Sequence, residues 1–351
     1  MEKFTIVQSA RAIPSRVVTN DDLALFMDTS DEWISSRTGI RQRHIVDTED
    51  TSDLAVTVAE KLLHQAGLTA DQLDFILVGT MSPDTLSPSV AQIVQGKIGA
   101  HNAFAWDLSA ACSGFVYTLS MASSLLSTRY ERGLVIGAEV LSKLVDWEDR
   151  STAVLFGDGA AGVLLERTTA ATGLLAESLK TFGERSQFLT AGQQQNANHF
   201  AGTLKTADPY FKMDGREVYS FATREVPNVL NEALAKADLT PDDIDVYLLH
   251  QANGRIISSI AKRFGQPIEK FPMNMASYGN TSAASIGILL DELREAGTVH
   301  AGQTIAIAGY GGGIDGWRLD YQGVIYFSKI VYGVYILIFK LLLNFKENRG
   351  Y

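Results

Sequence analysis

The chain contains a single cysteine, Cys112, in residues 106–115, whose sequence is W-D-L-S-A-A-C-S-G-F. The apolar pattern predicts a short buried strand over residues 103–108 and a tightly packed helix over residues 115–125. Cys112 would then lie in the first turn of that helix, where unpaired N–H groups and the helix dipole lower the pKa of a thiol. This position is typical of a cysteine nucleophile. The alternative, commoner for a lone cysteine, is a small buried hydrophobic side chain.

Two polar residues in the second half of the chain are candidate partners of Cys112. His250 follows the apolar stretch 246–249 in L-L-H-Q-A-N, so we expect its imidazole at a strand end, where the following loop faces a pocket. Asn280 lies in the loop S-Y-G-N-T-S-A-A-S, before a helix of small residues predicted over 282–290. Each residue alone also fits an ordinary structural role, as a satisfied histidine and as a helix N-cap.

Two further segments could bind a ligand. Trp33 and Arg37 are four residues apart on one face of a predicted helix, so they could clamp a flat ring, although a surface arginine often simply covers a tryptophan. The segment G-Y-G-G-G at residues 309–313 follows a predicted strand, and its glycines would let a backbone N–H approach a ligand oxygen. A dinucleotide-binding loop there is disfavoured because the G-x-G-x-x-G spacing is not met.

The composition narrows the class of protein. The chain has 351 residues, of which 46% are hydrophobic and 20% charged, as in ordinary globular enzymes. A net charge of −10 disfavours non-specific nucleic-acid binding, and one cysteine excludes internal disulfides and structural zinc clusters. The first residues, M-E-K-F-T-I-V, lack the apolar run of a signal peptide and predict a first strand. We therefore expect a cytoplasmic enzyme.

An internal repeat organises the chain. Residues 68–78, L-T-A-D-Q-L-D-F-I-L-V, are echoed by residues 239–249, L-T-P-D-D-I-D-V-Y-L-L, at an offset of 171 (239 minus 68). The same offset relates residues 134–138 to residues 305–309. Strands and helices alternate in both halves, which predicts an α/β fold with mixed, mostly parallel sheets covered by helices. We assign residues 1–170 to a first half that carries Cys112 and residues 171–323 to a second half that carries His250 and Asn280.

Residues 324–351 form an atypical apolar extension. Residues 324–345 are far more apolar than the rest, but Lys329 and Lys340 leave an uninterrupted run shorter than the roughly 17 to 25 residues of a membrane span. An interfacial membrane helix or a cover for a hydrophobic surface are alternatives. We favour slightly an extension without a selected role, so membrane contact is not expected.

Taken together, these segments resemble the thiolase-fold condensing enzymes, and specifically the initiating β-ketoacyl-acyl-carrier-protein synthase III family. The resemblance covers residues 3 to 317 and rests on A-C-S-G-F at Cys112, H-Q-A-N at His250, G-N-T-S-A-A-S at Asn280 and the G-Y-G-G-G segment. D-E-W-I-x-x-R-T-G-I at Trp33, G-T-x-S-P-D after residue 78 and L-F-G-D-G-A after residue 154 add to it. The asparagine sets the chain apart from elongating ketosynthases, which carry a second histidine there, and a second cysteine, as in thiolases, is lacking.

The resemblance implies a layered αβαβα homodimer that works without a metal or cofactor. Cys112 would accept a short acyl group from acyl-CoA, and malonyl-acyl-carrier protein would then lose carbon dioxide and condense with that acyl group. His250 and Asn280 would stabilise the enolate, and the backbone N–H groups of Cys112 and Gly312 would form a second oxyanion hole. These assignments agree with the chemistry of the reaction, because both steps build negative charge on a thioester oxygen.

The resemblance also assigns binding residues. Trp33, Arg37 and Arg150 would bind the nucleotide end of CoA, and Asn253 would bind its pantetheine arm. A basic patch would dock the acidic carrier protein, although its members also fit a solvated helix face: Arg255, Lys262 and Arg263.

The chain departs from the family pattern at Ser220, where relatives often have a basic residue of the docking patch, and in two further segments, and its exact reaction stays open. Tyr310 stands where phenylalanine is common, and residues 314–317, I-D-G-W, differ from the pattern of the final strand. The primer could be acetyl, branched or longer. A condensing enzyme of secondary metabolism with another acceptor, a thiol hydrolase and a non-catalytic acyl-binding protein are the alternative functions.

Overall fold

The computed structural model describes residues 2–170, 172–194, 199–200, 202, 207–313, 317–319, 325–327 and 331–340. The strands of the first half are β1 (Glu2–Ala12), β2 (Arg16–Thr19), β3 (Gln42–Ile45), β4 (Phe75–Gly79), β5 (Phe104–Leu108), β6 (Arg132–Glu139) and β7 (Gly159–Arg167). Those of the second half are β8 (Gly173–Phe182), β9 (Leu189–Thr190), β10 (Lys212–Met213), β11 (Val246–Leu249), β12 (Thr304–Gly313) and β13 (Trp317–Leu319), and those of the apolar extension are β14 (Ile325–Phe327) and β15 (Val331–Lys340).

The helices alternate with these strands. They are α1 (Asn20–Ala24), α2 (Asp31–Thr38), α3 (Thr51–Ala66), α4 (Val90–Lys97), α5 (Gly114–Leu126), α6 (Arg150–Ala153), α7 (Gly215–Ala237), α8 (Gly254–Phe264), α9 (Met275–Tyr278) and α10 (Ser285–Glu295). Capping supports several of them. For example, Ser30 accepts a hydrogen bond from the backbone N–H of Trp33 at the start of α2, and Gly39 ends that helix in the left-handed conformation.

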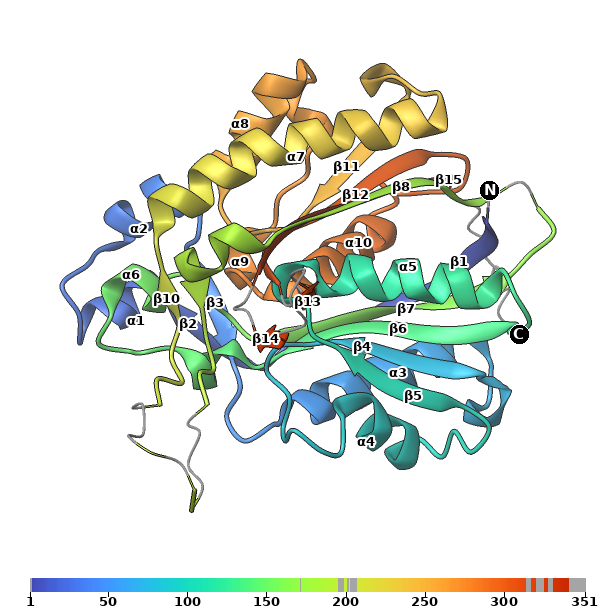
Figure 1. Cartoon of the computed structure of the whole chain (residues 1–351), viewed down its shortest axis with the longest axis horizontal. Coiled ribbons are helices and arrows are strands. Elements are labelled where there is room, and N and C mark those ends of the chain that lie inside the picture. The colour runs from blue at the N-terminus through green and yellow to red at the C-terminus, as the bar shows by residue number, and fades with distance from the viewer. Residues whose placement is uncertain are drawn as a thin grey trace.

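Helices and sheet alternate in five layers, as the resemblance implies. Figure 1 shows α7 and α8 on one outside, α3 and α4 on the other, and α5 and α10 in the middle between two parts of the sheet. The sheet has nine strands in the order β11-β12-β15-β8-β1-β7-β6-β4-β5. It is mixed, as expected, but the expected predominance of parallel pairs is not found. Only β4–β5, β4–β6 and β11–β12 are parallel among the described pairs, because β7 and β15 run antiparallel to both of their neighbours and β1 runs antiparallel to β8.

The offset of 171 relates structural elements as well as sequence. The 3-10 turn η2 (Ala111–Ser113) leads into α5, and the turn η7 (Ser282–Ala284) leads into α10 in the same way (282 minus 111). Ala111 and Ser282 also share an unusual positive φ, 45° and 47°. Cys112 and the Asn280 loop therefore lie at equivalent corners of the two halves, and α5 and α10 bring those corners together at the centre.

The apolar extension contributes a central strand. Residues 331–340 form β15, which pairs along its length with β12 and β8, and residues Val334 to Phe339 are at most 3% exposed. Alternate side chains pack into two different cores, Val334, Ile336 and Ile338 on the α7 side and Tyr335, Leu337 and Phe339 on the α5 side. The expectation of an extension without a role is therefore wrong for these residues, and so is an interfacial helix. A strand buried on both faces carries the same unbroken apolar pattern as a lipid-facing segment.

Gly333 lets β15 cross the centre of the molecule. A Cβ atom at this position would lie 2.2 Å from the ring of Tyr335, so only glycine leaves room for that ring. Gly333 faces Gly311 of β12 in the ladder, and Gly311 lies beside Cys112. Ile314, Asp315 and Gly316 lie outside the described residues. Within the part of the chain that the structure describes, no helix is long and apolar enough to cross a membrane.

Candidate active site

Cys112 lies at the junction of β5 and α5, as predicted. It occupies the turn η2, two residues before α5 begins at Gly114, and it is 7% exposed. The β12 backbone passes close to the thiol, since a Cβ atom added at Gly311 would lie 3.3 Å from Sγ. Gly311 has a φ of +145°, which L residues rarely adopt. The glycine-rich segment therefore packs directly against the cysteine.

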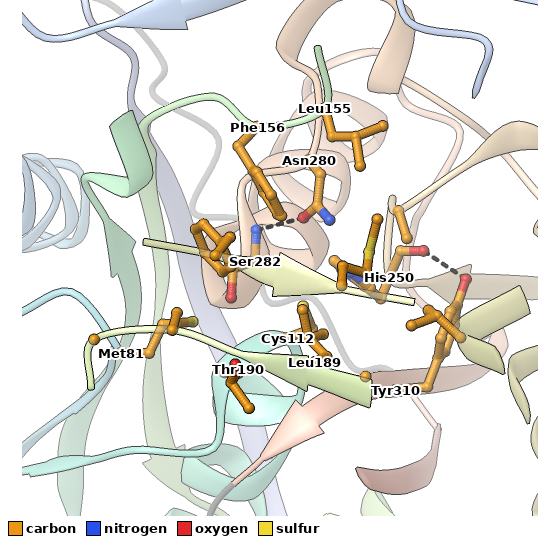
Figure 2. Close-up of a pocket in the computed structure, with 18 of the residues that line it drawn as sticks. Met81, Cys112, Leu155, Phe156, Leu189, Thr190, His250, Asn280, Ser282 and Tyr310 are labelled. Atoms are coloured by element: carbon orange, nitrogen blue, oxygen red, sulfur yellow. Dashed lines mark hydrogen bonds between the residues drawn. The ribbon is translucent and has the colours of Figure 1, made fainter. Parts of the chain in front are cut away.

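The three predicted chemical residues line one cavity. It has a volume of about 820 Å³, and its walls include Cys112, His250 and Asn280. Figure 2 shows these side chains converging from the two halves, and the apolar side chains of Met81, Phe156 and Leu189 lie around them. The cavity is large enough for a drug-sized ligand and combines an apolar lining with a few polar groups, as ligand sites do.

His250 is held as a neutral imidazole at the end of β11. Its Nδ1 atom lies 2.7 Å from the hydroxyl oxygen of Ser285, and the backbone N–H of Gln251 approaches the same oxygen at 3.5 Å. Because that oxygen accepts from Gln251, its proton is free to be donated to Nδ1, and we assign the ring proton to Nε2. Burial lowers the pKa of His250 to about 3. The ring therefore offers a neutral N–H donor.

The buried histidine predicts a pH-dependent stability. Between its native pKa of about 3 and its ordinary value of 6.5, the unfolded state binds a proton that the native state does not, so stability rises with pH in this window. From this residue alone, the free energy of unfolding is expected to be about 2 kcal/mol lower at pH 5 than at pH 8. Urea unfolding of the wild type and of His250→Gln at both pH values measures it. An equal pH dependence in the two proteins would contradict the assignment.

Asn280 is oriented by its own loop. Its backbone N–H donates to the carbonyl of Leu155 at 2.8 Å, and its carbonyl accepts from the N–H of Gly157 at 3.0 Å. The side-chain oxygen Oδ1 accepts from the N–H of Ser282 at 2.9 Å. This bond fixes the amide so that Nδ2 is the group left to donate in the cavity. Asn280 and His250 thus present two neutral donors to one space.

The thiol itself differs from the expectation. The pKa of Cys112 is raised to about 12, chiefly by burial; the hydroxyl of Ser282 opposes this rise and the carboxyl of Glu139 adds to it. The expected lowering of the pKa by the helix start is therefore wrong, because the turn that carries Cys112 is itself removed from water. The resting residue is a thiol, and it must lose its proton as it reacts.

The residues predicted to bind CoA gather at the mouth of the cavity. The guanidinium groups of Arg37 and Arg150 lie 4.7 Å and 4.8 Å from the centre of the Trp33 ring. Asn253 donates through Nδ2 to the backbone carbonyl of Arg37 at 3.1 Å and caps α8 through Oδ1. Both arginines thus lie over the tryptophan ring, and the binding of a base there stays a prediction.

The remaining predicted residues lie at two places. Arg255, Lys262 and Arg263 are exposed along α8, and Arg263 donates to the carbonyl of Thr223 at 2.8 Å. Gly312 lies in β12 next to Gly311, and its role as an oxyanion donor stays a prediction. Among the described residues, no group of three or more His, Cys, Asp or Glu side chains could hold a metal ion.

The sequence analysis missed three residues of the site. They are Ser285, which contacts the His250 ring, Ser282, which affects the thiol, and Glu139, a fully buried carboxyl. The internal repeat could have indicated two of them, since Ser282 is equivalent to Ala111, beside Cys112, and Glu139 is equivalent to Tyr310 in the glycine-rich segment (310 minus 139 is 171).

Two family models match the chain. One is described as 3-Oxoacyl-[acyl-carrier-protein (ACP)] synthase III and matches residues 106–183, and the other is described as its C terminal part and matches residues 234–316. The β-ketoacyl-[acyl-carrier-protein] synthase III of Streptococcus suis is 56% identical over 312 residues, which are 88% of this chain and 95% of that relative. The chain belongs to the β-ketoacyl-[acyl-carrier-protein] synthase III family. It is therefore a condensing acyltransferase of fatty-acid synthesis.

Solved structures agree with this membership. The crystal structure of 3-oxoacyl-[acyl-carrier-protein] synthase III from Aquifex aeolicus has a TM-score of 0.83 and 37% identity, covering 95% of this chain and 99% of that one. A priming β-ketosynthase from the R1128 polyketide pathway has a TM-score of 0.82 at 29% identity, covering 96% of each chain. The family model of the synthase III C terminal part ends at residue 316, so β15 lies beyond it.

Proposed function

We propose that the chain joins a short acyl group from acyl-CoA to malonyl-acyl-carrier protein, with Cys112, His250 and Asn280 as its catalytic residues. One observation carries the assignment of these residues: a buried thiol and two neutral hydrogen-bond donors line a single cavity. The neutral donors matter because a carboxylate in their place would repel the enolate that decarboxylation produces.

In the first step, Cys112 takes the acyl group. Its sulfur attacks the thioester carbon, the bond between that carbon and the CoA sulfur breaks, and the thiol proton leaves with the CoA thiolate as free CoA. In the assigned tautomer Nε2 of His250 already carries a hydrogen and Nδ1 is bonded to Ser285, so the ring acts as a donor and the thiol proton passes to the departing CoA sulfur. The backbone N–H groups of Cys112 and Gly312 would stabilise the tetrahedral oxyanion.

In the second step, the malonyl-carrier thioester enters the part of the cavity that CoA has left, while the acyl group stays on Cys112. Its carboxylate leaves as carbon dioxide, and the electron pair becomes an enolate whose oxygen accepts hydrogen bonds from His250 Nε2–H and Asn280 Nδ2–H. The enolate carbon attacks the acyl carbon, and the bond to the Cys112 sulfur breaks. The product is a β-ketoacyl-carrier thioester, and Cys112 regains a proton from solvent.

Trp33 is expected to bind the acyl-CoA substrate. Trp33→Ala removes the ring on which both guanidinium groups lie, so we predict a rise of about 10- to 100-fold in KM for acyl-CoA. The KM for malonyl-acyl-carrier protein should change less than about threefold. Steady-state kinetics with each substrate varied in turn measure both values. An equal rise in the two constants would show that the tryptophan does not discriminate between them.

We propose that an acyl carrier protein docks on the exposed cations of α8. The chain has a net charge of −10, so an acidic partner needs a local positive surface, and Arg255, Lys262 and Arg263 supply one. The cations lie on the same helix whose N-cap, Asn253, lines the cavity mouth. A prosthetic arm from a protein bound there would have a short path to Cys112. A cytoplasmic location and the absence of a cofactor stay predictions.

We also propose a homodimer in which two β5 strands meet. β5 ends the nine-stranded sheet, and an unpaired edge strand invites pairing with a second copy. Its Trp106 is 39% exposed and stacks on Phe104 at 5.5 Å, and the nearby Leu86 is 78% exposed. Leu86 and Ser87 also line the cavity, so a partner copy would close its apolar side.

Intact-protein mass spectrometry tests the proposed function. The wild type is incubated with a panel of acetyl-, branched- and longer-chain acyl-CoAs, and malonyl-acyl-carrier protein is then added. One acyl adduct that is discharged into a β-ketoacyl-carrier product supports the proposal and names the primer. Discharge only into another acceptor would favour a role nearer to the polyketide relative, and discharge into water would favour a thiol hydrolase. No adduct with any acyl-CoA would overturn the proposal.

A further inference from the structure

Two residues occupy equivalent positions in strands of the two halves. Glu139 ends β6 and Tyr310 lies at the matching position of β12, 171 residues later (310 minus 139). Both are buried, 0% and 2% exposed, and both lie next to a strand, β4 or β11, whose following loop lines the cavity.

Glu139 holds the loop after β4. Its carboxyl accepts hydrogen bonds from Thr80 Oγ1 at 3.1 Å, from the N–H of Met81 at 3.2 Å and from Ser82 Oγ at 2.5 Å. Thr80 and Met81 line the cavity. A side chain at the end of one strand therefore fixes the segment that leaves the neighbouring strand.

Tyr310 makes the corresponding contact in the second half. Its hydroxyl donates to the backbone carbonyl of His250 at 2.8 Å, where the chain leaves β11. Its ring meets the imidazole edge-on, with centroids 5.4 Å apart and planes at 71°. Figure 2 shows the hydroxyl bond and the position of Tyr310 beside His250. The tyrosine thus touches His250 through both the backbone and the ring.

We infer that the Tyr310 hydroxyl is a positioning group for His250 in the malonyl-consuming step, an inference that rests on the proposed function. The hydroxyl is not a catalytic group, because its bond goes to a backbone carbonyl and not to the reacting atoms. It fixes the carbonyl of His250, while Ser285 fixes Nδ1, so the direction of Nε2–H is set from two sides.

The bond is available at every working pH. Burial raises the pKa of Tyr310 well above its ordinary value, so the hydroxyl keeps the proton that it donates. A phenylalanine at this position would keep the ring contact and lose the bond. Tyr310→Phe therefore removes one interaction without opening a cavity.

The experiment compares Tyr310→Phe with Tyr247→Phe. Tyr247 is a buried tyrosine of β11 whose hydroxyl also donates to a backbone carbonyl, that of Pro241, at 2.9 Å, so it is a matched control outside the cavity. For Tyr310→Phe we expect decarboxylation of malonyl-acyl-carrier protein to slow by about 5- to 10-fold, and acylation of Cys112 to change by less than about twofold. For Tyr247→Phe both rates should stay within about twofold of the wild type.

Histidine NMR provides a readout that needs no turnover. The chain has six histidines, and His250→Asn identifies the His250 signals. We expect these signals to shift in Tyr310→Phe and not in Tyr247→Phe. Unchanged His250 signals, or equal losses in both half-reactions, would overturn the inference. Shifted signals in a protein whose wild type consumes no malonyl-acyl-carrier protein would support the positioning role and refute the proposed function.

Discussion

Replacing Cys112 with alanine is expected to abolish the acyl-enzyme and to lower the rate of condensation by at least about 10³-fold. The reason is that no other thiol exists in the chain, and the other candidate residues, His250 and Asn280, are neutral donors that cannot carry an acyl group in its place. Intact-protein mass after incubation with acyl-CoA measures the adduct, and the β-ketoacyl-carrier product measures the condensation.

The same variant separates the two steps of the proposed reaction. Cys112→Ala keeps the hydrogen bond between His250 and Ser285 and the one between Asn280 and Ser282. We therefore expect this variant still to decarboxylate malonyl-acyl-carrier protein. His250→Ala should show the reverse, an acyl adduct with little decarboxylation. An acyl adduct on Cys112→Ala at the wild-type level would contradict the assignment of the nucleophile.

Replacing Leu337 with aspartate is expected to prevent folding. Leu337 is fully buried in β15, where it packs among residues of the central core such as Leu119 and Ile286. A carboxylate there would have no water and no partner, and such a change removes several kcal/mol from the typical 5 to 15 kcal/mol of a folded protein. The yield of soluble protein, circular dichroism and urea unfolding measure the effect. A chain that ends before Val331 should behave in the same way, because it lacks the strand between β12 and β8.

Lys340→Asp is the matched control for that prediction. Lys340 is the last residue of the same strand, and its side chain is exposed, so the free energy of unfolding should change by no more than about 0.5 kcal/mol. If Leu337→Asp unfolded at the same urea concentration as the wild type, β15 would not be part of the sheet.

The chemical residues could be predicted from the sequence because their patterns are local. Cys112 at a strand-to-helix junction, His250 at a strand end and Asn280 in a glycine loop are each specified by about ten neighbouring residues. The internal repeat predicted two similar halves, and the structure shows that the Cys112 and Asn280 segments are equivalent in them and line one cavity. Periodicity and the repeat therefore predicted an α/β fold in two halves, and the resemblance of the local motifs to a known family predicted its layers and its reacting groups.

Only the tertiary structure decided the properties that depend on contacts between segments far apart in the sequence. The pKa of Cys112 rises because β12 and the Asn280 loop exclude water from a helix start that, by itself, would lower it. The bond from Tyr310 to His250 joins residues 60 positions apart. The position of β15 was not predictable because it depends on β12 and β8, the two strands between which it inserts. Its apolar sequence alone is equally compatible with a lipid surface and with a strand buried on both faces. Burial on both faces depends on the strands and helices that pack against β15, and the local sequence pattern carries no information about them.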